Sequence, residues 1–578
     1  MRIALFLSFL VSGATAYLGT SDLLADPTSS QVLVSCVVLI LTIALGFSMK
    51  NNLKFRRKLE ALEETSELEE PASTAPQAHH LSKAGNHEPR KIDDQLSFKN
   101  SMNELVDFVV DYSENPHKFS CENDLKPGFL WKTLPKEAPM KAENYRSVMD
   151  DFFKLILPGF SQGRNQHPAN YSFPDILAEA LNSCFCTIPF TWDASPAATE
   201  LEIAMINWFG RAIGLPDSFL FTGETSHASP GGGAIQPSAT DAVFIALMVS
   251  RDKKIAEIVP KHLDGVERKE VEAEILSRMV AYSSEEAHFG AFTKSCRLSM
   301  VRSQAIPVDD KFALDASALE QQIREDLANN LIPFHVHATS GTATVTAFDD
   351  LEAIGRVAEE HGLWMHVDAG SGGSVWACEE FRFLAKGIER AHSVNANCDE
   401  FFLQSSPVSY LWSRDQQSFL NTFGVDATYL KGTGRTMDFR DWGIQLSRRS
   451  MALRSWFLFK MYGMKGIQEY IRRISKMTKM VLSQLQKESR IAIVGASNLG
   501  SVCFKVKSED SSESNRLTSL LCDRIIKSGK IQVAEVRVKE GSVIRVAVTG
   551  ERTTEEDMEE LCRSLKSIIH EFILEYFE

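Results

Sequence analysis

The sequence lacks several patterns that would assign it to a common class of protein. No two of its ten cysteines are spaced Cys-x-x-Cys, so neither a zinc ribbon nor a thioredoxin-like redox site is indicated. No Gly-Lys-Ser or Gly-Lys-Thr triplet follows its glycine-rich stretch, which excludes a P-loop. Basic residues are not in excess: the net charge of −14 argues against nucleic acid as a partner, because phosphate binding needs a basic surface.

The remaining composition is that of a globular protein without internal repeats. At 578 residues the chain exceeds what one hydrophobic core supports, so we expect about two to four folded units. Most cysteines lie in apolar runs, where a buried and reduced thiol is the expected state. Reduced thiols are typical of cytosolic proteins.

The N-terminal region carries two apolar runs. Residues 1–16 have one early arginine and end in Ala-Thr-Ala, as a signal peptide does. Residues 32–49 are uncharged and would span about 27 Å as a helix, so we predict a transmembrane helix there. Basic residues follow at once from Lys50, and the positive-inside rule then predicts a membrane-anchored protein with its main domain in the cytosol. A hairpin of both runs gives the same orientation; a buried helix or a wrongly assigned start codon is the alternative.

Residues 50–95 are predicted to be a charged, disordered linker. An acid-rich stretch follows the basic cluster, and residues 71–89 are rich in Ala, Ser, His and Pro. From residue 96 onward, apolar side chains recur at helical spacing: Phe98, Met102, Leu105, Val109 and Tyr112. We therefore predict an N-terminal helical segment over residues 96–180.

The middle of the chain alternates between helix and strand. Helices are predicted at Leu201–Ile213 and Ser238–Arg251, the second with Ser238 and Asp241 in capping-box spacing. Strands are predicted at Leu331–Ala338 and Leu363–Val367, with a helix between them that starts at Asp349 and Asp350 and ends at Gly362. This order predicts a largely parallel α/β sheet in a large domain over residues 181–452.

The last part, residues 453–578, has a different pattern. Short alternating strands are interleaved with helices, the last from Glu555 to Phe577, and the strands are Arg490–Val494, Val502–Val506, Ile531–Val538 and Val543–Val548. We predict a separate small α+β domain.

Several residues could bind a ligand at the carboxyl ends of these strands, where parallel sheets usually bind their ligands. Thr339 and Asp368 both fall there, and Asp368 would need a structural cation or a ligand if buried. Gly231–Gly233 precedes the helix that Ser238 and Thr240 open, so it is either a phosphate-binding loop or an ordinary turn.

Three histidines have no assigned role from pattern alone. His288 follows a predicted strand, and a lone histidine in such a place usually has a structural role. His335 and His337 lie two apart on one strand and so face the same side, but a metal site would need a third ligand. We predict no metal site.

Together these residues carry a resemblance. From about residue 96 to 575 the chain resembles the pyridoxal phosphate (PLP) dependent group II amino-acid decarboxylases, in particular the aromatic-amino-acid and histidine decarboxylases. The matching motifs, in chain order, include Phe190–Glu202, the Gly231 stretch, Ala338-Thr339, His366–Ala369, Asp426–Lys431 and Phe459–Gly466. The resemblance implies a type I PLP-dependent transferase fold and a homodimer, with the active site shared between subunits and residues 96–180 at the dimer interface.

The resemblance also implies roles for single residues. Asp368 would pair with the pyridine nitrogen of PLP, His288 would stack on the ring, and Thr339 would contact the cofactor. Tyr429 would be the catalytic-loop tyrosine that returns a proton to the substrate after CO2 leaves. Phosphate contacts are implied for Ser238, Thr240 and Asn397.

The chain departs from the family at the lysine that binds PLP covalently. Where the family has Asn-x-Asn-Pro-His-Lys-Trp, residues 395–401 read Asn-Ala-Asn-Cys-Asp-Glu-Phe. No gap is needed, since Gly387–Glu389 before and Tyr410–Trp412 after also match, so Glu400 stands at the lysine position. A carboxylate cannot form an imine, and PLP, if bound, would be held without a covalent bond.

Other departures fall at the same pocket. Pro237 replaces a glycine beside the phosphate, and Gly370-Ser371 replaces Ala-Tyr. The segment between Gln166 and Phe173, which lines the substrate pocket in the family, is shorter, and so is the loop after Lys431. Because the segment that would select the amino-acid ligand is altered, no substrate is named.

Three functions are consistent with this pattern. The first is a membrane-tethered pseudoenzyme with little or no decarboxylase activity. The second is an active aromatic amino-acid or histidine decarboxylase that uses PLP held without a covalent bond. The third is a purely structural dimerisation partner.

Overall fold

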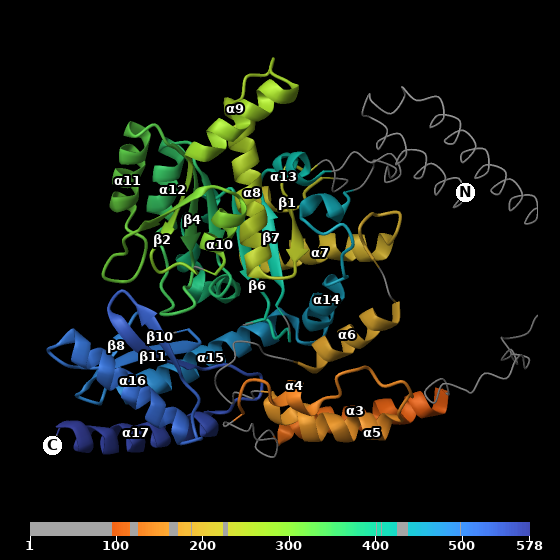
Figure 1. Cartoon of the computed structure of the whole chain (residues 1–578), viewed down its shortest axis with the longest axis vertical. Coiled ribbons are helices and arrows are strands. Elements are labelled where there is room, and N and C mark those ends of the chain that lie inside the picture. Colours follow the sequence, from red (N-terminus) through yellow and green to blue (C-terminus); the bar gives the residue numbers. More distant parts are fainter. Residues whose placement is uncertain are drawn as a thin grey trace, which may run out of the picture. The chain divides into compact units, whose positions relative to one another are not determined.

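The computed structural model describes residues 95–115, 125–160, 172–185, 188–223, 229–288, 290–399, 401–405, 407–424, 437–497 and 499–577 (Figure 1). All of them belong to one compact unit from Arg90 to Glu578. The predicted signal-like segment 1–16, the transmembrane helix 32–49 and nearly all of the linker 50–95 lie outside the described residues. Within the described ranges, no helix has the length and apolar character needed to cross a membrane.

A seven-stranded sheet forms the centre of this unit, in the order β1-β7-β6-β5-β4-β2-β3. Strands β2 to β6 run parallel, and β7 alone runs against its two neighbours, which confirms a mixed, mostly parallel sheet. The strands are β1 Gly232–Gln236, β2 Met279–Ser284, β3 Arg302–Ile306, β4 Ile332–Thr339, β5 Trp364–Asp368, β6 Ser393–Asn397 and β7 Ser409–Ser413. The register places Asp368 opposite Thr339 on one side and opposite Asn395 on the other.

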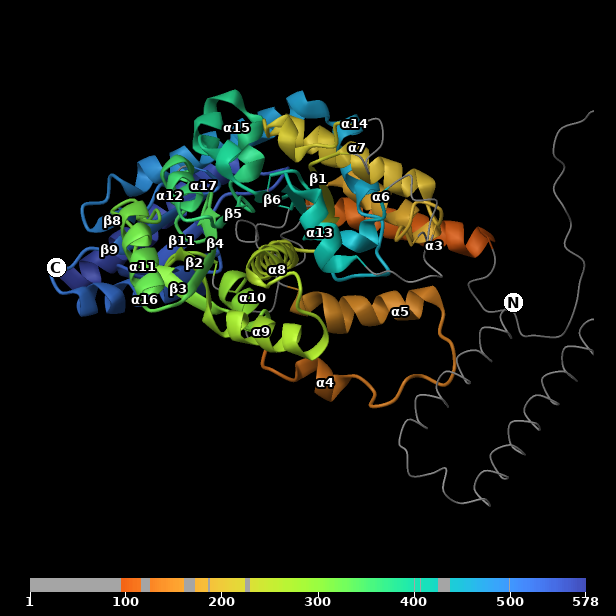
Figure 2. The same ribbon diagram turned by 90° about the horizontal axis from the view of Figure 1, so that it is seen from above.

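Helices cover both faces of this sheet, which is why all its strands except the edge strand β3 are almost continuously buried (Figure 2). Helices α8 (Ala239–Ile258) and α10 (Phe292–Leu298) lie on the face that bears His335, because Ser250 and Phe292 contact that ring. The predicted helix between β4 and β5 is α12 (Leu351–Glu360), capped by Asp350 as expected. The remaining helices of this region are α7 Pro196–Ala212, α9 Gly265–Arg278, α11 Ala316–Ala328 and α13 Gln416–Phe423.

Two residues of the glycine triplet lie in a strand, so the prediction of a loop is wrong for them. Gly232 and Gly233 lie in β1, where every residue is buried. A Cβ atom on Gly231 would lie 1.9 Å from the Ser218 carbonyl oxygen, and one on Gly233 would lie 2.5 Å from the Leu411 carbonyl oxygen. The glycines therefore allow close packing of β1 against neighbouring backbone rather than the approach of a ligand.

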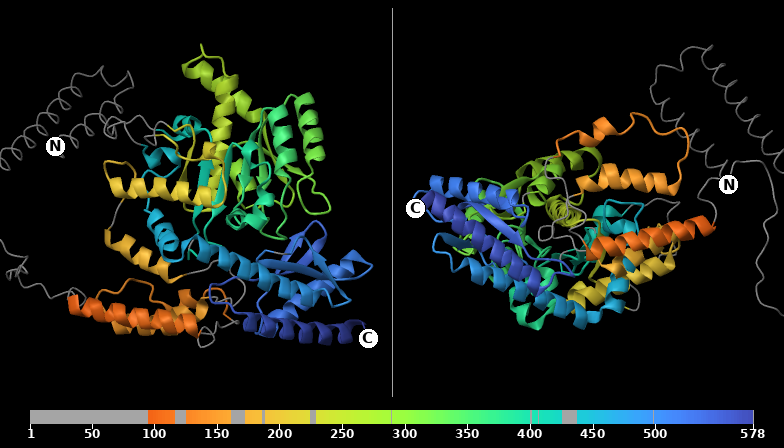
Figure 3. Two further views of the ribbon diagram at one scale, coloured as in Figure 1. Left: turned by 180° about the vertical axis from the view of Figure 1, so that it is seen from behind. Right: turned by 90° about the horizontal axis from the view of Figure 1, so that it is seen from below.

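A second, antiparallel sheet lies near the C-terminus, in the order β10-β11-β9-β8. Its strands are β8 Ile491–Val494, β9 Ser501–Val506, β10 Ala534–Val538 and β11 Gly541–Ala547. Helices α15 (Gly463–Leu485) and α17 (Glu555–Phe577) pack on each other beside it, and α16 (Ser511–Lys527) covers it (Figure 3). The predicted α+β pattern is confirmed, whereas the domain borders at residues 180 and 452 stay predictions, because both sheets fall in one compact unit.

The N-terminal part is helical, as predicted. Its helices are α3 Gln95–Glu114, α4 Phe129–Thr133, α5 Tyr145–Asp151 and α6 Phe173–Phe185, and α14 Ala452–Met461 packs on α6. Short 3-10 or π turns occur at Phe152–Ile156, Leu157–Gly159, Asp217–Phe219, Gly373–Ala377, Glu379–Ala385, Ile388–Arg390 and Phe439–Trp442.

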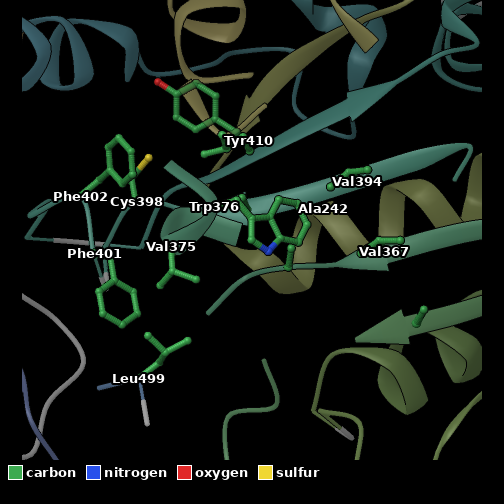
Figure 4. Close-up of a cluster of buried hydrophobic side chains, with 14 of the residues drawn as sticks. Ala242, Val367, Val375, Trp376, Val394, Cys398, Phe401, Phe402, Tyr410 and Leu499 are labelled. Atoms are coloured by element: carbon green, nitrogen blue, oxygen red, sulfur yellow. The ribbon is translucent and has the colours of Figure 1, made fainter. Parts of the chain in front are cut away.

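The main hydrophobic core extends from the large sheet and its helices into the C-terminal sheet and the helices that pack on it. Figure 4 shows part of it, with Val367 of β5, Val394 of β6 and Trp376 from the turn after β5. Five of the seven described cysteines are buried, as predicted, and none of the seven forms a disulfide; Cys184 is exposed.

Candidate cofactor site

Asp368 ends strand β5 with its carboxylate almost fully buried. Its Oδ1 atom accepts hydrogen bonds of 3.0 Å from the Gly370 amide and from Asn395 Nδ2. Its Oδ2 atom accepts none from the described residues, and His337 Nε2 lies 3.7 Å away from it. A buried carboxylate is costly unless its lone pairs are used, so this oxygen is available to a ligand.

A chain of hydrogen bonds holds the bonded oxygen. Trp364 Nε1 donates to Ser393 Oγ at 2.8 Å, and Ser393 contacts His366 Nδ1 at 2.9 Å. His366 Nε2 contacts Asn395 Oδ1 at 2.9 Å, and Asn395 Nδ2 reaches Asp368. Because a carboxylate only accepts, each bond must point toward Asp368, which fixes the Asn395 amide and the His366 tautomer.

Burial favours the neutral form of three histidines in this region, His335, His337 and His366. Burial, with a smaller effect from the nearby His288, lowers the pKa of His337 to about 3. Burial also lowers the pKa of His366 and of His335. A neutral imidazole has one donor and one acceptor nitrogen, which is what the directed bonds through His366 require.

Several buried polar atoms at this end of the sheet have no partner among the described residues. They are Thr339 Oγ1, Ser340 Oγ, Asn397 Oδ1 and both ring nitrogens of His337. Gly370 leaves room beside them, since a Cβ atom there would lie 3.1 Å from Asp368 Oδ1 and 3.2 Å from Asn397 Nδ2. Unpaired buried polar atoms are destabilising, so this grouping fits a polar aromatic ligand such as PLP.

The start of helix α8 has the predicted cap. Ser238 Oγ accepts from the Asp241 amide at 3.2 Å and donates to the Asp241 carboxylate at 2.6 Å. The Ser238 hydroxyl is thus already used, and Pro237 offers no amide, so backbone amides near Thr240 are the free donors of this helix end. Phosphate contacts of Ser238, Thr240 and Asn397 stay predictions.

His288 lies in the turn after β2, and its side chain is exposed. Its carbonyl oxygen accepts from the Ala291 and Phe292 amides at the start of α10. Because β2 runs parallel to β4 and β5, His288 follows it at the same end of the sheet as Asp368. Stacking of His288 on a cofactor ring stays a prediction.

Glu400 and Tyr429 lie outside the described residues, so their predicted roles rest on sequence alone. The residues beside Glu400 are described. Cys398 is buried, and burial raises the pKa of Asp399 to about 6.

The segment after Glu400 is anchored by a buried ion pair. Arg454 Nε lies 2.6 Å from Asp175 Oδ1, with side chains 2% and 0% exposed. Asp175 Oδ2 accepts from the Ser405 amide at 2.8 Å and from Ser405 Oγ at 2.5 Å. Ser172 Oγ also donates to the Leu403 carbonyl oxygen.

Sequence reasoning found Asp368, Thr339 and Asn397 but missed the residues that orient Asp368. Strand alternation was the available signal, because residues two apart share a face. His366 lies two residues before Asp368, and Asn395 lies two before Asn397. The pairing of His337 with His366 needs the register between β4 and β5, which the sequence does not contain.

Known proteins resemble this chain over most of its length. The model of the pyridoxal-dependent decarboxylase conserved domain matches residues 127–507. Aromatic-L-amino-acid decarboxylase of Bos taurus is 36% identical over 467 residues, which cover 79% of this chain and 93% of that protein. Histidine decarboxylase of Drosophila melanogaster is 35% identical over 462 residues, which cover 79% of this chain and 53% of that protein.

Solved structures resemble its fold. The crystal structure of Oryza sativa TDC with PLP and tryptamine has a TM-score of 0.77 at 26% identity and covers 84% of this chain and 99% of that chain. Rhodiola rosea 4-hydroxyphenylacetaldehyde synthase has a TM-score of 0.75 at 28% identity and covers 83% of this chain and 99% of that chain.

Proposed function

The chain belongs to the pyridoxal-dependent decarboxylase family, whose cofactor is PLP, and we propose that it is a membrane-tethered pseudoenzyme with little or no decarboxylase activity. The observation that carries this proposal is Glu400 at the position of the lysine. PLP supplies an electron sink when it is bound, and the lysine amine captures it and later displaces the product. A carboxylate can do neither.

The rest of the pocket supports binding without covalent attachment. Asp368 offers Oδ2 to the pyridine nitrogen, while Asn395 and Gly370 hold its other oxygen in place. Thr339 and Asn397 offer buried oxygens that have no other partner among the described residues. Orientation by fixed dipoles does not depend on residue 400, so the pocket could retain a ligand after losing its reactive group.

Covalent trapping tests the proposal. The full chain is incubated with PLP, treated with borohydride and digested, and its lysines are examined by mass spectrometry. We expect no lysine to carry the pyridoxyl group. A single lysine labelled in stoichiometric amount would contradict the proposal, because it would identify a replacement for the missing amine.

An active decarboxylase that uses non-covalent PLP is the second candidate. The intact hydrogen bonding of Asp368 favours it, because amino acids react with free PLP and only need the ring to be oriented. Release of CO2 from histidine, tyrosine, tryptophan and dihydroxyphenylalanine separates the candidates. CO2 release above that of free PLP would establish activity and contradict the pseudoenzyme proposal.

We further propose that the chain is a homodimer, which would also suit a purely structural dimerisation partner. Large apolar side chains are exposed on its N-terminal helical part: Phe98 is 58%, Val106 54%, Trp131 86% and Met140 98% exposed. Large exposed apolar side chains gathered in one part of a chain support an interface there. Light scattering after size exclusion should give twice the mass of the chain, and a monomer would contradict the proposal.

The membrane tether through residues 32–49 and the cytosolic placement of the main domain are proposals from sequence. The chain should stay in the membrane fraction after alkaline carbonate extraction, and deletion of residues 1–49 should release it. Recovery of the full chain in the supernatant would contradict the tether.

A further inference from the structure

His337 is a buried side chain at this site, and no hydrogen bond among the described residues accounts for its two ring nitrogens. Its ring is 0% exposed, and neither nitrogen has a hydrogen-bond partner among the described residues. It packs against Phe292, with ring centroids 5.1 Å apart, and against His366, with centroids 5.6 Å apart. A histidine that served only to fill this space would leave two polar atoms unpaired, which apolar residues would avoid.

The position of His337 gives its Nε2 atom one acceptor within reach. Asp368 Oδ2 lies 3.7 Å from Nε2, and this oxygen receives no other donor from the described residues. A shift of about 0.7 Å would bring the two atoms to an ordinary N–H···O distance. Because the carboxylate only accepts, the neutral ring must carry its proton on Nε2 to bond there.

The same oxygen is the one that would receive the pyridine nitrogen of the cofactor. Oδ1 is already occupied by the Asn395 and Gly370 donors, so Oδ2 is the remaining acceptor of Asp368. Two donors are therefore aimed at one atom, one from the protein and one from the ligand. The oxygen has two lone pairs, so both donors can reach it, but they share its negative charge and each bond weakens the other.

We infer that His337 is a positioning residue that acts as a built-in partner of Asp368, bonding its Oδ2 atom when no cofactor is present and competing with the pyridine nitrogen when one binds. The cofactor half of this inference rests on the proposed function; the bond in the free protein does not. Its consequence is that the folded chain keeps a buried carboxylate without needing PLP.

His335 provides a matched control on the same strand and face. It is equally buried, but its Nδ1 atom lies 2.9 Å from Ser250 Oγ, and it makes no hydrogen bond or ion pair with Asp368. Replacing either histidine with leucine removes a buried ring of similar size. Only His337→Leu should remove a hydrogen bond to Asp368 Oδ2.

A double-variant comparison on the free chain tests the bond. We use His337→Leu, Asp368→Ala and both together, because an asparagine at 368 could donate to His337 and restore a contact. His337→Leu should lower the melting temperature in both backgrounds, but by about 2 °C less when Asp368 is already alanine. The effects of substitutions at two residues in contact are not additive. The His335→Leu loss should be the same in both backgrounds. Additive losses for His337 would overturn the inference.

A ligand titration tests the competition and does not need a variant of Asp368. The probe is 4′-deoxypyridoxine 5′-phosphate, which has the ring nitrogen and phosphate but no aldehyde. His337→Leu should bind it about fivefold more tightly than the wild-type chain, as expected for one competing hydrogen bond. His335→Leu should match the wild type, and His337→Gln, which keeps a donor, should restore wild-type affinity.

Unchanged or weaker binding by His337→Leu would overturn the competition. Absence of binding in every variant would instead contradict the proposed cofactor site, and the comparison on the free chain would still decide whether His337 bonds Asp368.

Discussion

Replacing Asp175 with asparagine should loosen the segment that follows Glu400. Asp175 is fully buried, and its two oxygens bond Arg454 at 2.6 and 2.9 Å. Oδ2 also holds the amide and hydroxyl of Ser405. Asparagine has nearly the same shape but no charge, and its amide group would face donors where an oxygen now accepts.

The expected cost follows from the burial of the pair. Removing one member of a buried ion pair leaves the other charge uncompensated, which costs about 3 to 5 kcal/mol. Glu179 Oε1 lies 3.3 Å from Arg454 Nε and would keep part of the attraction, so we take the lower value of about 3 kcal/mol. That loss corresponds to local opening about 100-fold more often.

Hydrogen–deuterium exchange followed by mass spectrometry measures this opening directly. Peptides containing Phe401 to Ser405 should exchange about 100-fold faster in Asp175→Asn, while peptides from β8 and β9 should not change. Glu179→Gln is the control, because its partly exposed contact should cost less than about 1 kcal/mol. Unchanged exchange at residues 401–405 would show that the ion pair does not anchor this segment.

Three further outcomes are expected. Glu400→Lys should allow borohydride to attach PLP at residue 400. If no PLP is attached, Pro237 and the shortened segments also prevent the pocket from capturing the cofactor. The wild-type chain should bind pyridoxamine phosphate more tightly than PLP in calorimetry, because its ammonium can pair with the Glu400 carboxylate, and equal affinities would contradict this. Burial raises the pKa of Asp399 to about 6, so the folded chain holds this proton more tightly and loses stability as the pH rises from about 4 to 6. Asp399→Asn should therefore raise the melting temperature at pH 7.5 but not at pH 4; equal shifts at both would refute the assignment.

Features set by neighbouring residues in the sequence could be predicted. The cap of α8 at Ser238 and the cap of α12 at Asp350 depend on residues three apart, and both are present. The strand that ends at Asp368 follows from its apolar run, and the mostly parallel order follows from the helix between two strands.

Features that depend on distant parts of the chain could not be predicted. Gly231 and the glycines of β1 resemble a ligand loop in sequence, and only the closeness of the Ser218 and Leu411 carbonyls shows why they are needed. The bond between Arg454 and Asp175 joins residues 279 positions apart, so no local pattern signals it. Glu400, by contrast, was found by alignment with a family motif.

The hydrogen-bond chain from Trp364 to Asp368 has an electrostatic consequence. Its four bonds all point the same way, so their dipoles add, with the positive ends directed at the carboxylate. Among the described residues, aligned dipoles rather than a cationic side chain hold the carboxylate, which remains available to a cationic ring. Reactivity and retention of a ligand are therefore separate properties of this pocket, and a chain could lose the first at residue 400 while strands β5 and β6 preserve the second.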